Sequence, residues 1–127
     1  MRIPEELLYT ASHEWVQFLD EHTARIGITD YAQHSLGDIV YVNLPAAGDA
    51  VTTGESFTDL ESVKAVADIY SPVSGVIARV NEALDEAPEL INQDPYAAWL
   101  IEIADVSARE ELMDAGAYRA QCEREGA

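Results

Sequence analysis

The chain contains 127 residues, of which 48% are hydrophobic, and its 24 acidic and 7 basic side chains give a net charge of -17 at pH 7. This length predicts a single domain with a modest core, and the apolar content excludes a disordered chain. The absence of a Lys/Arg cluster excludes general nucleic-acid binding, and the charge disfavours an anionic membrane surface as a partner. An acidic surface that keeps the protein in solution, including in a high-salt cytoplasm, explains most of the charge.

The N-terminus and the cysteine count indicate the cellular setting. The first residues lack the basic, apolar and small-residue sections of a signal peptide, and no apolar run reaches the length of a membrane span. Cys122 is the only cysteine, which excludes an intramolecular disulfide and a Cys-x-x-Cys redox pair. We therefore expect a soluble cytoplasmic protein.

Alternating apolar and polar residues predict β-structure over the first two-thirds of the chain. A short helix is expected at 29–34, capped by Thr29 or Asp30 and ending at Gly37. A weak repeat aligns residues 37–43 with residues 75–81, which suggests two similar sheets packed face to face and linked at one end by the hairpin around residue 64. The expected strands are 15–19, 23–28, 39–44 and 56–61.

The C-terminal residues change to helical signals. Ser107 and Glu110 have the spacing of a capping box, which predicts a helix through residues 111–113. Asp114 predicts the start of a second helix through residues 118–122. Together these signals predict a mainly β fold, a flattened β-barrel or sandwich of two small sheets with short helices and a helical C-terminus.

Lys64 is the only lysine in the chain, and arginines supply the rest of the positive charge. The β-branched Val63 and Val66 around it favour strands that enter and leave a tight turn. A further turn follows at residues 71–75, where Pro72 fixes φ and a glycine frees it. A single primary amine at such a turn is what an enzyme needs to attach a prosthetic group by amide linkage. The alternative is an ordinary exposed lysine.

The sequence around Lys64 resembles the lipoylation hairpin of the glycine cleavage system H protein family, over residues 61–65 and 68–75. In that family a lysine often occupies the position of Glu102, and an acidic residue there fits the acidic surface of this chain. The resemblance extends over nearly the whole chain, through further segments at 12–16, 27–33, 36–42, 80–84, 88–92, 94–96 and 99–101.

The resemblance implies a non-catalytic carrier with lipoate attached to the side-chain nitrogen of Lys64. In the family, the lipoyl arm takes an aminomethyl group from a pyridoxal-phosphate-dependent glycine decarboxylase and delivers it to a tetrahydrofolate-dependent aminomethyltransferase. Dihydrolipoyl dehydrogenase then reoxidises the arm, and a lipoylating enzyme is the fourth implied partner. The family also folds the loaded arm into a surface cleft, and Ser12, Glu14 and Asp68 stand where it places polar arm contacts.

The resemblance also implies how the chain is organised. A single lipoyl-carrier domain would cover residues 1–127, with an N-terminal extension at 1–22, a β core at about 23–105 and a helical segment at about 107–124. Three alternatives stay open. The chain could be an H-like protein that donates lipoyl groups in lipoate assembly, a biotinyl carrier, whose lysine is typically flanked by methionines, or a structural β protein with an unmodified lysine.

The three histidines, His13, His22 and His34, lack the spacing of a metal site, and no metal is expected. His13 is adjacent to Glu14 and is a candidate for partner docking. A structural role is the favoured interpretation for His13.

Overall fold

The computed structural model describes residues 1–126, which form two antiparallel sheets and four helices. The larger sheet has six strands, in the order β1 (Leu8–Tyr9), β2 (Glu14–Phe18), β3 (Ala24–Ile28), β9 (Ile101–Arg109), β8 (Val73–Val80) and β5 (Ala50–Val51). The smaller sheet has three, in the order β4 (Ile39–Val42), β6 (Ser56–Ser62) and β7 (Val66–Tyr70). The helices are α1 (Asp30–Leu36), α2 (Ala83–Glu86), α3 (Leu90–Gln93) and α4 (Ala115–Arg124). None of these helices is long and apolar enough to cross a membrane.

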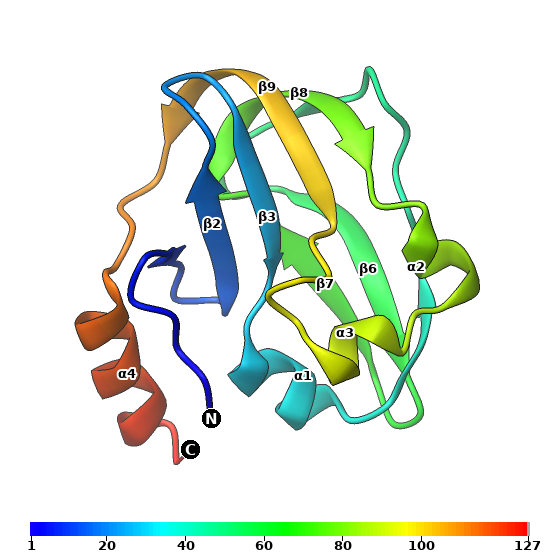
Figure 1. The fold of residues 1–127 in the computed structure, drawn as a ribbon, viewed down its shortest axis with the longest axis vertical. Helices are drawn as coiled ribbons and strands as arrows, with labels where there is room; N and C mark the ends of the chain where they lie inside the picture. The colour runs from blue at the N-terminus through cyan, green and yellow to red at the C-terminus, as the bar shows by residue number, and fades with distance from the viewer. Residues whose placement is uncertain (127) are drawn as a thin grey trace.

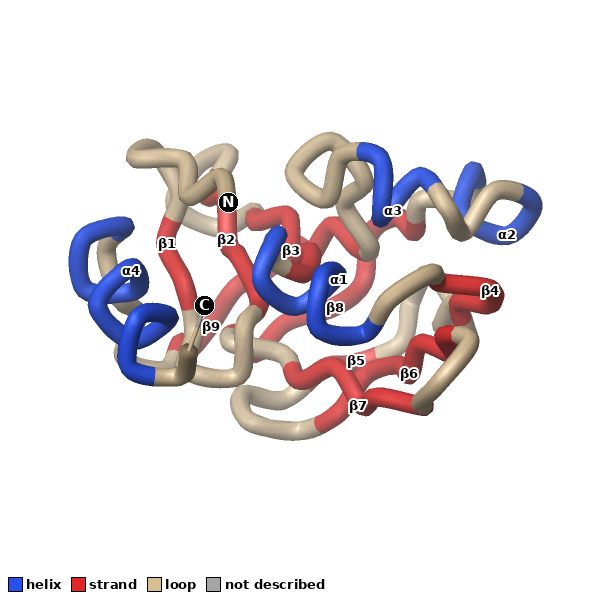
Figure 2. The backbone as a smooth tube through the Cα atoms, turned by 90° about the horizontal axis from the view of Figure 1, so that it is seen from below, coloured by secondary structure: helices blue, strands red, loops and turns tan. Residues whose placement is uncertain are grey.

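The two sheets form a flattened sandwich with the helices at its margins. Figure 1 shows β6 and β7 to the right of β3, and α4 standing at the side of the molecule where both chain ends lie. The view in Figure 2 separates the layer that contains β6 and β7 from the side that carries α2 and α3. The predicted mainly β fold with short helices and a C-terminal helix is confirmed, and the sheets stay separate instead of closing into a barrel.

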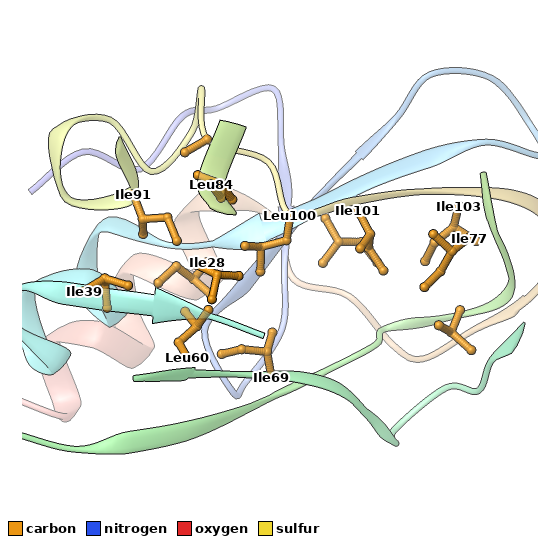
Figure 3. Close-up of a cluster of buried hydrophobic side chains, with 14 of the residues drawn as sticks. Ile28, Ile39, Leu60, Ile69, Ile77, Leu84, Ile91, Leu100, Ile101 and Ile103 are labelled. Atoms are coloured by element: carbon orange, nitrogen blue, oxygen red, sulfur yellow. The ribbon is translucent and has the colours of Figure 1, made fainter. Parts of the chain in front are cut away.

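Aliphatic side chains fill the space between the sheets, as Figure 3 shows. Ile28 from the larger sheet and Leu60 and Ile69 from the smaller one are each at most 5% exposed. They alternate with exposed residues such as Glu61 and Tyr70, because successive side chains of a strand point to opposite faces. Each fully buried aliphatic side chain stabilises the fold by about 2 kcal/mol.

A second core joins α4 to the N-terminal part of the chain. Tyr118 stacks on Tyr9 with ring centroids 4.6 Å apart and planes inclined by 6°. Trp15 and Cys122 are buried in the same cluster. Cys122 is 0% exposed, so this cysteine is a core residue although it lies in a polar stretch of sequence, and burial raises the pKa of its thiol.

Three local predictions from the sequence are confirmed: the first hairpin, the cap of α1 and the cap of α4. β2 and β3 form the hairpin expected at 15–19 and 23–28. Thr29 caps α1 by accepting a hydrogen bond from Ala32 N at 3.2 Å, and Gly37 ends that helix with a φ of 80°. Asp114 caps α4 through Ala117 N at 2.8 Å.

The helix predicted from the capping box at Ser107 is wrong. Residues up to Arg109 belong to β9, which pairs with β8 by placing Ala108 opposite Ser74 and Arg109 opposite Val73. Pairing with a long neighbouring strand satisfies more backbone groups than one helical turn would, so tertiary contacts override the local signal. The helical C-terminus therefore begins at Ala115.

The hairpin around Lys64 joins β6 to β7 within the smaller sheet, so the prediction that it links two sheets is wrong. The two copies of the sequence repeat do lie in different sheets, at β4 and at β8. These sheets have three and six strands, however, and are not similar. β2, from the expected N-terminal extension, pairs with β3 from the expected core, so both regions share one sheet.

Candidate functional site

Lys64 lies at the tip of the hairpin between β6 and β7, which is the green turn at the bottom of Figure 1. Its side chain is exposed, and Val63 and Val66 beside it are 69% and 67% exposed. The aliphatic part of Lys64 lies over Gly37, where an added Cβ would be 3.5 Å from Lys64 Cε. The hairpin therefore presents the amine to solvent next to the end of α1.

Ser62 shapes the tip of this hairpin. Its hydroxyl oxygen accepts hydrogen bonds from Lys64 N at 3.2 Å and from Ala65 N at 3.0 Å, and its own amide donates to Ala65 O at 2.8 Å. Val63 N donates to Asp38 O at 3.0 Å. A short hydroxyl side chain commonly closes a turn in this way, and here it holds the backbone of the only lysine.

Asn92 supports the segment on which the tip rests. Its Oδ1 accepts a hydrogen bond from Ile39 N at 2.8 Å. Its Nδ2 donates to Gly37 O at 2.9 Å and to Gln33 Oε1 at 3.0 Å. These three bonds hold α3 to the end of α1 and the start of β4. The lysine hairpin contacts the same segment, through Val63 N and Asp38 O and through Lys64 and Gly37, so Asn92 supports the hairpin indirectly.

A buried carboxylate, Glu14, lies at the start of β2 and is 1% exposed. The hydroxyls of Thr10 and Ser12 both donate to its Oε1 at 2.6 Å. Tyr70 N donates to its Oε2 at a longer distance of 3.4 Å. Thr10 Oγ1 also accepts from Glu14 N at 2.9 Å, so the carboxylate and its own backbone are held by one side chain.

The surroundings of Glu14 act on its pKa in opposite directions. Burial raises the pKa of Glu14, and the hydrogen bonds from Ser12, Thr10 and Tyr70 N oppose that rise only in part. Glu110, whose amide donates to Pro72 O at 2.9 Å, is close enough to sense the charge of Glu14. Burial and the charge of Glu14 raise the pKa of Glu110 as well. A cation brought next to these two carboxyl groups would favour their charged forms and lower their pKa values.

β7 connects the lysine tip to this carboxylate. Val66 follows the tip, and Tyr70, at the other end of β7, donates to Glu14. The four steps between them span roughly 13 Å at 3.3 Å per residue. β7 is an edge strand, and Tyr70 N points away from β6. Backbone groups alternate along a strand, so those of Asp68 and Val66 face the same free edge.

His13 joins the Glu14 loop to α1 and α4. Its φ of 72° is left-handed, and its ring stacks on Tyr31 with centroids 4.4 Å apart. Its Nδ1 lies 2.7 Å from the Tyr118 hydroxyl, and its Nε2 lies 3.2 Å from a carboxylate oxygen of Glu125. These contacts agree with the structural interpretation of His13.

The structure brings two of the three expected cleft residues together. Ser12 and Glu14 are hydrogen-bonded to each other. Asp68 lies on the exposed outer face of β7, directly opposite Asp59, and within residues 1–126 it shares no hydrogen bond with Glu14. Asp68 therefore lies along the strand that leads to Glu14, not at the carboxylate itself.

Thr10, Tyr70 and Glu110 are site residues that the sequence interpretation missed. Thr10 could have been found, because short hydroxyl side chains such as Thr10 and Ser12 favour a hydrogen-bonded turn, and in the structure Thr10 O accepts a hydrogen bond from His13 N at 3.2 Å. Tyr70 and Glu110 carry no such signal, since strand packing alone brings them near Glu14. Within the described part of the chain, no group of three or more His, Cys, Asp or Glu residues is placed to hold a metal ion.

Known proteins are similar to this chain over most of its length. The model of the glycine cleavage H-protein family matches residues 7–125. The glycine cleavage system H protein of Lachnoclostridium phytofermentans is 54% identical over 118 residues, which is 93% of each chain. The H protein of Mycobacterium tuberculosis is 52% identical over 126 residues, covering 92% of this chain and 94% of the relative.

A solved structure gives the same result. The crystal structure of a glycine cleavage system H protein from Mycobacterium marinum matches with a TM-score of 0.89 at 40% identity, over 95% of this chain and 99% of the other. Residues 7–125, which the family model matches, include both sheets, the lysine hairpin and the Glu14 loop. From the sequence match and the shared fold together, we conclude that the chain belongs to the glycine cleavage H-protein family.

Proposed function

We propose that Lys64 carries lipoate and that the protein shuttles the aminomethyl group of glycine between two enzymes. The donor is the pyridoxal-phosphate-dependent glycine decarboxylase, and the acceptor is the tetrahydrofolate-dependent aminomethyltransferase. Dihydrolipoyl dehydrogenase and a lipoylating enzyme complete the set of partners. As a member of the H-protein family the chain is a carrier and not a catalyst. We also propose that residues 1–127 act as one lipoyl-carrier domain.

One observation carries this proposal: the only lysine lies at an exposed hairpin tip, one strand away from a buried carboxylate. A lipoyl-lysine arm reaches roughly 14 Å from the backbone by its bond lengths, and β7 spans roughly 13 Å. The residues present therefore fit the group. When bound, lipoate supplies a disulfide that opens to two thiols, one of which can hold the carbon of the cargo.

The residues of this chain would protect the cargo while it travels. The Glu14 carboxylate would hold the amine of the cargo as an ammonium ion through a charge-assisted hydrogen bond. Its nearly complete burial supports exclusion of water from that end of the arm. Ser12 and Asp68 are the other polar residues that we assign to the arm cleft, Ser12 at the carboxylate and Asp68 midway along β7.

The first test is the intact mass of the protein isolated from its own cells, with peptide mapping around Lys64. We expect a lipoyl increment on the peptide that contains Lys64. The matched control is Lys64→Arg, which keeps the exposed positive charge and removes the acylable amine, so it should fold normally and stay unmodified. A biotin increment would assign the chain to the carboxylase carriers, and an unmodified Lys64 in cells that lipoylate other proteins would refute the carrier role.

The second test separates shuttle from donor. The lipoylated protein is incubated with glycine labelled at its methylene carbon and with glycine decarboxylase, and bound label is measured. We expect label on the wild type and none on Lys64→Arg. Transfer of the lipoyl group to other apo-proteins, with no glycine-dependent label, would instead support the lipoyl-donor alternative.

A further inference from the structure

We propose that Thr10 is a positioning residue that fixes the Glu14 carboxylate so that Oε2, and not Oε1, receives the amine of the loaded arm. This inference rests on the proposed shuttle function. It assigns a separate role to each oxygen of one carboxylate and to a side chain that the arm itself does not reach.

The first step concerns Oε1, which already has its full set of partners. Thr10 Oγ1 and Ser12 Oγ each donate to it at 2.6 Å. A carboxylate oxygen offers about two good acceptor directions, and bonds as short as these are charge-assisted. An amine that approached Oε1 would have to displace a hydroxyl.

The second step concerns Oε2, which has capacity left. Its one protein donor within residues 1–126 is Tyr70 N, at 3.4 Å, which is a long and weak hydrogen bond. That donor belongs to the free edge of β7, the strand that begins beside Lys64. Oε2 therefore has an acceptor direction that no protein donor within residues 1–126 uses, and it lies beside the far end of the strand that begins next to Lys64.

The third step separates Thr10 from Ser12. Thr10 is 1% exposed, so it acts only through Glu14, whereas Ser12 is exposed and can meet the arm directly. Thr10 also closes the loop that carries Glu14. Its amide donates to Glu14 O at 3.0 Å, and its carbonyl accepts from His13 N at 3.2 Å. One buried hydroxyl thus orients both the backbone and the carboxylate of Glu14.

The experiment compares Thr10→Val, which keeps the shape and removes the hydroxyl, with Thr10→Ser, which keeps the hydroxyl. In the unmodified protein, carbon-detected NMR follows the titration of the Glu14 carboxyl. We expect the pKa of Glu14 to rise in Thr10→Val, because a donor to the ionised form is lost, and to stay near the wild-type value in Thr10→Ser. Equal titration in all three proteins would overturn the inference.

The loaded arm gives the second readout. After glycine-dependent loading and removal of the loading enzyme, the first-order loss of labelled carbon should be about tenfold faster in Thr10→Val than in the wild type. Thr10→Ser should restore the wild-type lifetime. A Thr10→Val lifetime equal to that of the wild type would overturn the positioning role. Failure of the wild type itself to load would instead refute the shuttle, while the NMR titration would still report on Thr10 and Glu14.

A Thr10→Val protein that does not fold would still leave a decisive measurement on the wild type. The hydroxyl proton of Thr10 should exchange slowly, and its resonance should move with the titration of Glu14. A hydroxyl proton that exchanges rapidly or does not sense this titration would contradict the inference.

Discussion

His13 Nδ1 lies 2.7 Å from the hydroxyl of Tyr118, which links the residue next to Glu14 to the middle of α4. The same hydroxyl lies 2.6 Å from Thr29 Oγ1, the cap of α1. Three segments that are far apart in the sequence therefore meet at one buried oxygen. His13 has a left-handed backbone conformation, and its contact with Tyr118 holds the loop that carries Glu14 in this conformation.

The first prediction is that Tyr118→Phe destabilises the protein by about 1 to 3 kcal/mol, because it removes the hydroxyl that lies within hydrogen-bond distance of His13 Nδ1 and of the buried Thr29 hydroxyl. The stacking on Tyr9 is retained, so the change isolates the hydroxyl. The measurement is urea denaturation. The matched control is Tyr31→Phe, which removes a 3.3 Å bond to Glu125 O at the surface and should change stability by less than about 0.5 kcal/mol. Equal losses in both variants would contradict the assigned role.

The second prediction concerns the pH dependence of stability through Glu14. Burial raises the pKa of Glu14 above its unfolded value, so the folded protein binds this proton more tightly. The contribution of Glu14 to stability is then complete below the unfolded pKa and is lost as pH rises through the folded pKa. Glu14→Gln removes the titration. We expect the stability of Glu14→Gln relative to wild type to increase as the pH rises from the unfolded to the folded pKa of Glu14.

Denaturation of wild type and Glu14→Gln in parallel at several pH values checks this sign. Glu110→Gln serves as the second variant, because the negative charges of Glu14 and Glu110 repel each other. In Glu110→Gln, the pH range over which Glu14 changes the stability should therefore move to lower pH. A constant difference between Glu14→Gln and wild type at all pH values would show that Glu14 does not titrate with folding.

The features that could be predicted from the sequence are those that depend on neighbouring residues. The Thr29 cap, the end of α1 at Gly37 and the turn at Lys64 depend on residues within a few positions of one another, and all three are present. The helix expected at Ser107 failed for the opposite reason, since β8 supplies a partner strand that no local pattern reveals.

The same difference between short-range and long-range contacts applies to the site around Glu14. Glu14 could be named from the family resemblance, but its partners could not. Tyr70 N donates to Glu14 although β7 belongs to the other sheet, and Glu110 is close enough to sense the charge of Glu14 although β3 separates β2 from β9. Asn92 supports the lysine hairpin through Gly37, across 55 residues of sequence. Contacts of this length depend on sheet order, which composition and spacing do not determine.

The third prediction concerns Asp59 and Asp68, which lie directly opposite each other on β6 and β7. Like charges in this arrangement destabilise a sheet. We expect Asp68→Asn and Asp59→Asn each to stabilise the protein by about 0.5 kcal/mol, and the double variant to gain little more, because the repulsion is removed once. Glu61→Gln is the matched control. It removes one negative charge from β6, but Glu61 lies opposite Val66 and so has no carboxylate directly across from it.

The same two variants test the arm cleft. If Asp68 contacts the arm, Asp68→Asn should shorten the lifetime of the bound aminomethyl group, whereas Asp59→Asn should not. Equal lifetimes in the two variants would remove Asp68 from the cleft and leave it as a strand residue with an unfavourable neighbour.

The fourth prediction concerns Glu102, at a position where the resemblance in sequence led us to expect a lysine. Its carboxylate lies 3.0 Å from both Arg25 Nε and Arg79 Nη2. The two guanidinium groups lie over the ring of Trp99, at 4.8 and 5.5 Å from its centroid. Lysine at position 102 would bring three cations together, so this acid has a specific structural partner in addition to its effect on surface charge.

The hydrogen bond from Arg79, with that from Arg25, lowers the pKa of Glu102. A lowered pKa has the opposite consequence to that at Glu14: the stabilisation is present above the unfolded pKa and is lost as pH falls through the folded pKa. Because Arg79 is 57% exposed and Arg25 30% exposed, solvent screens the pairs, and Glu102→Gln should cost only about 1 kcal/mol at neutral pH. The cost should shrink in acid and in high salt, as measured by urea denaturation. A cost that persists at low pH would mean that packing on Trp99, and not the charge, holds Glu102 in place.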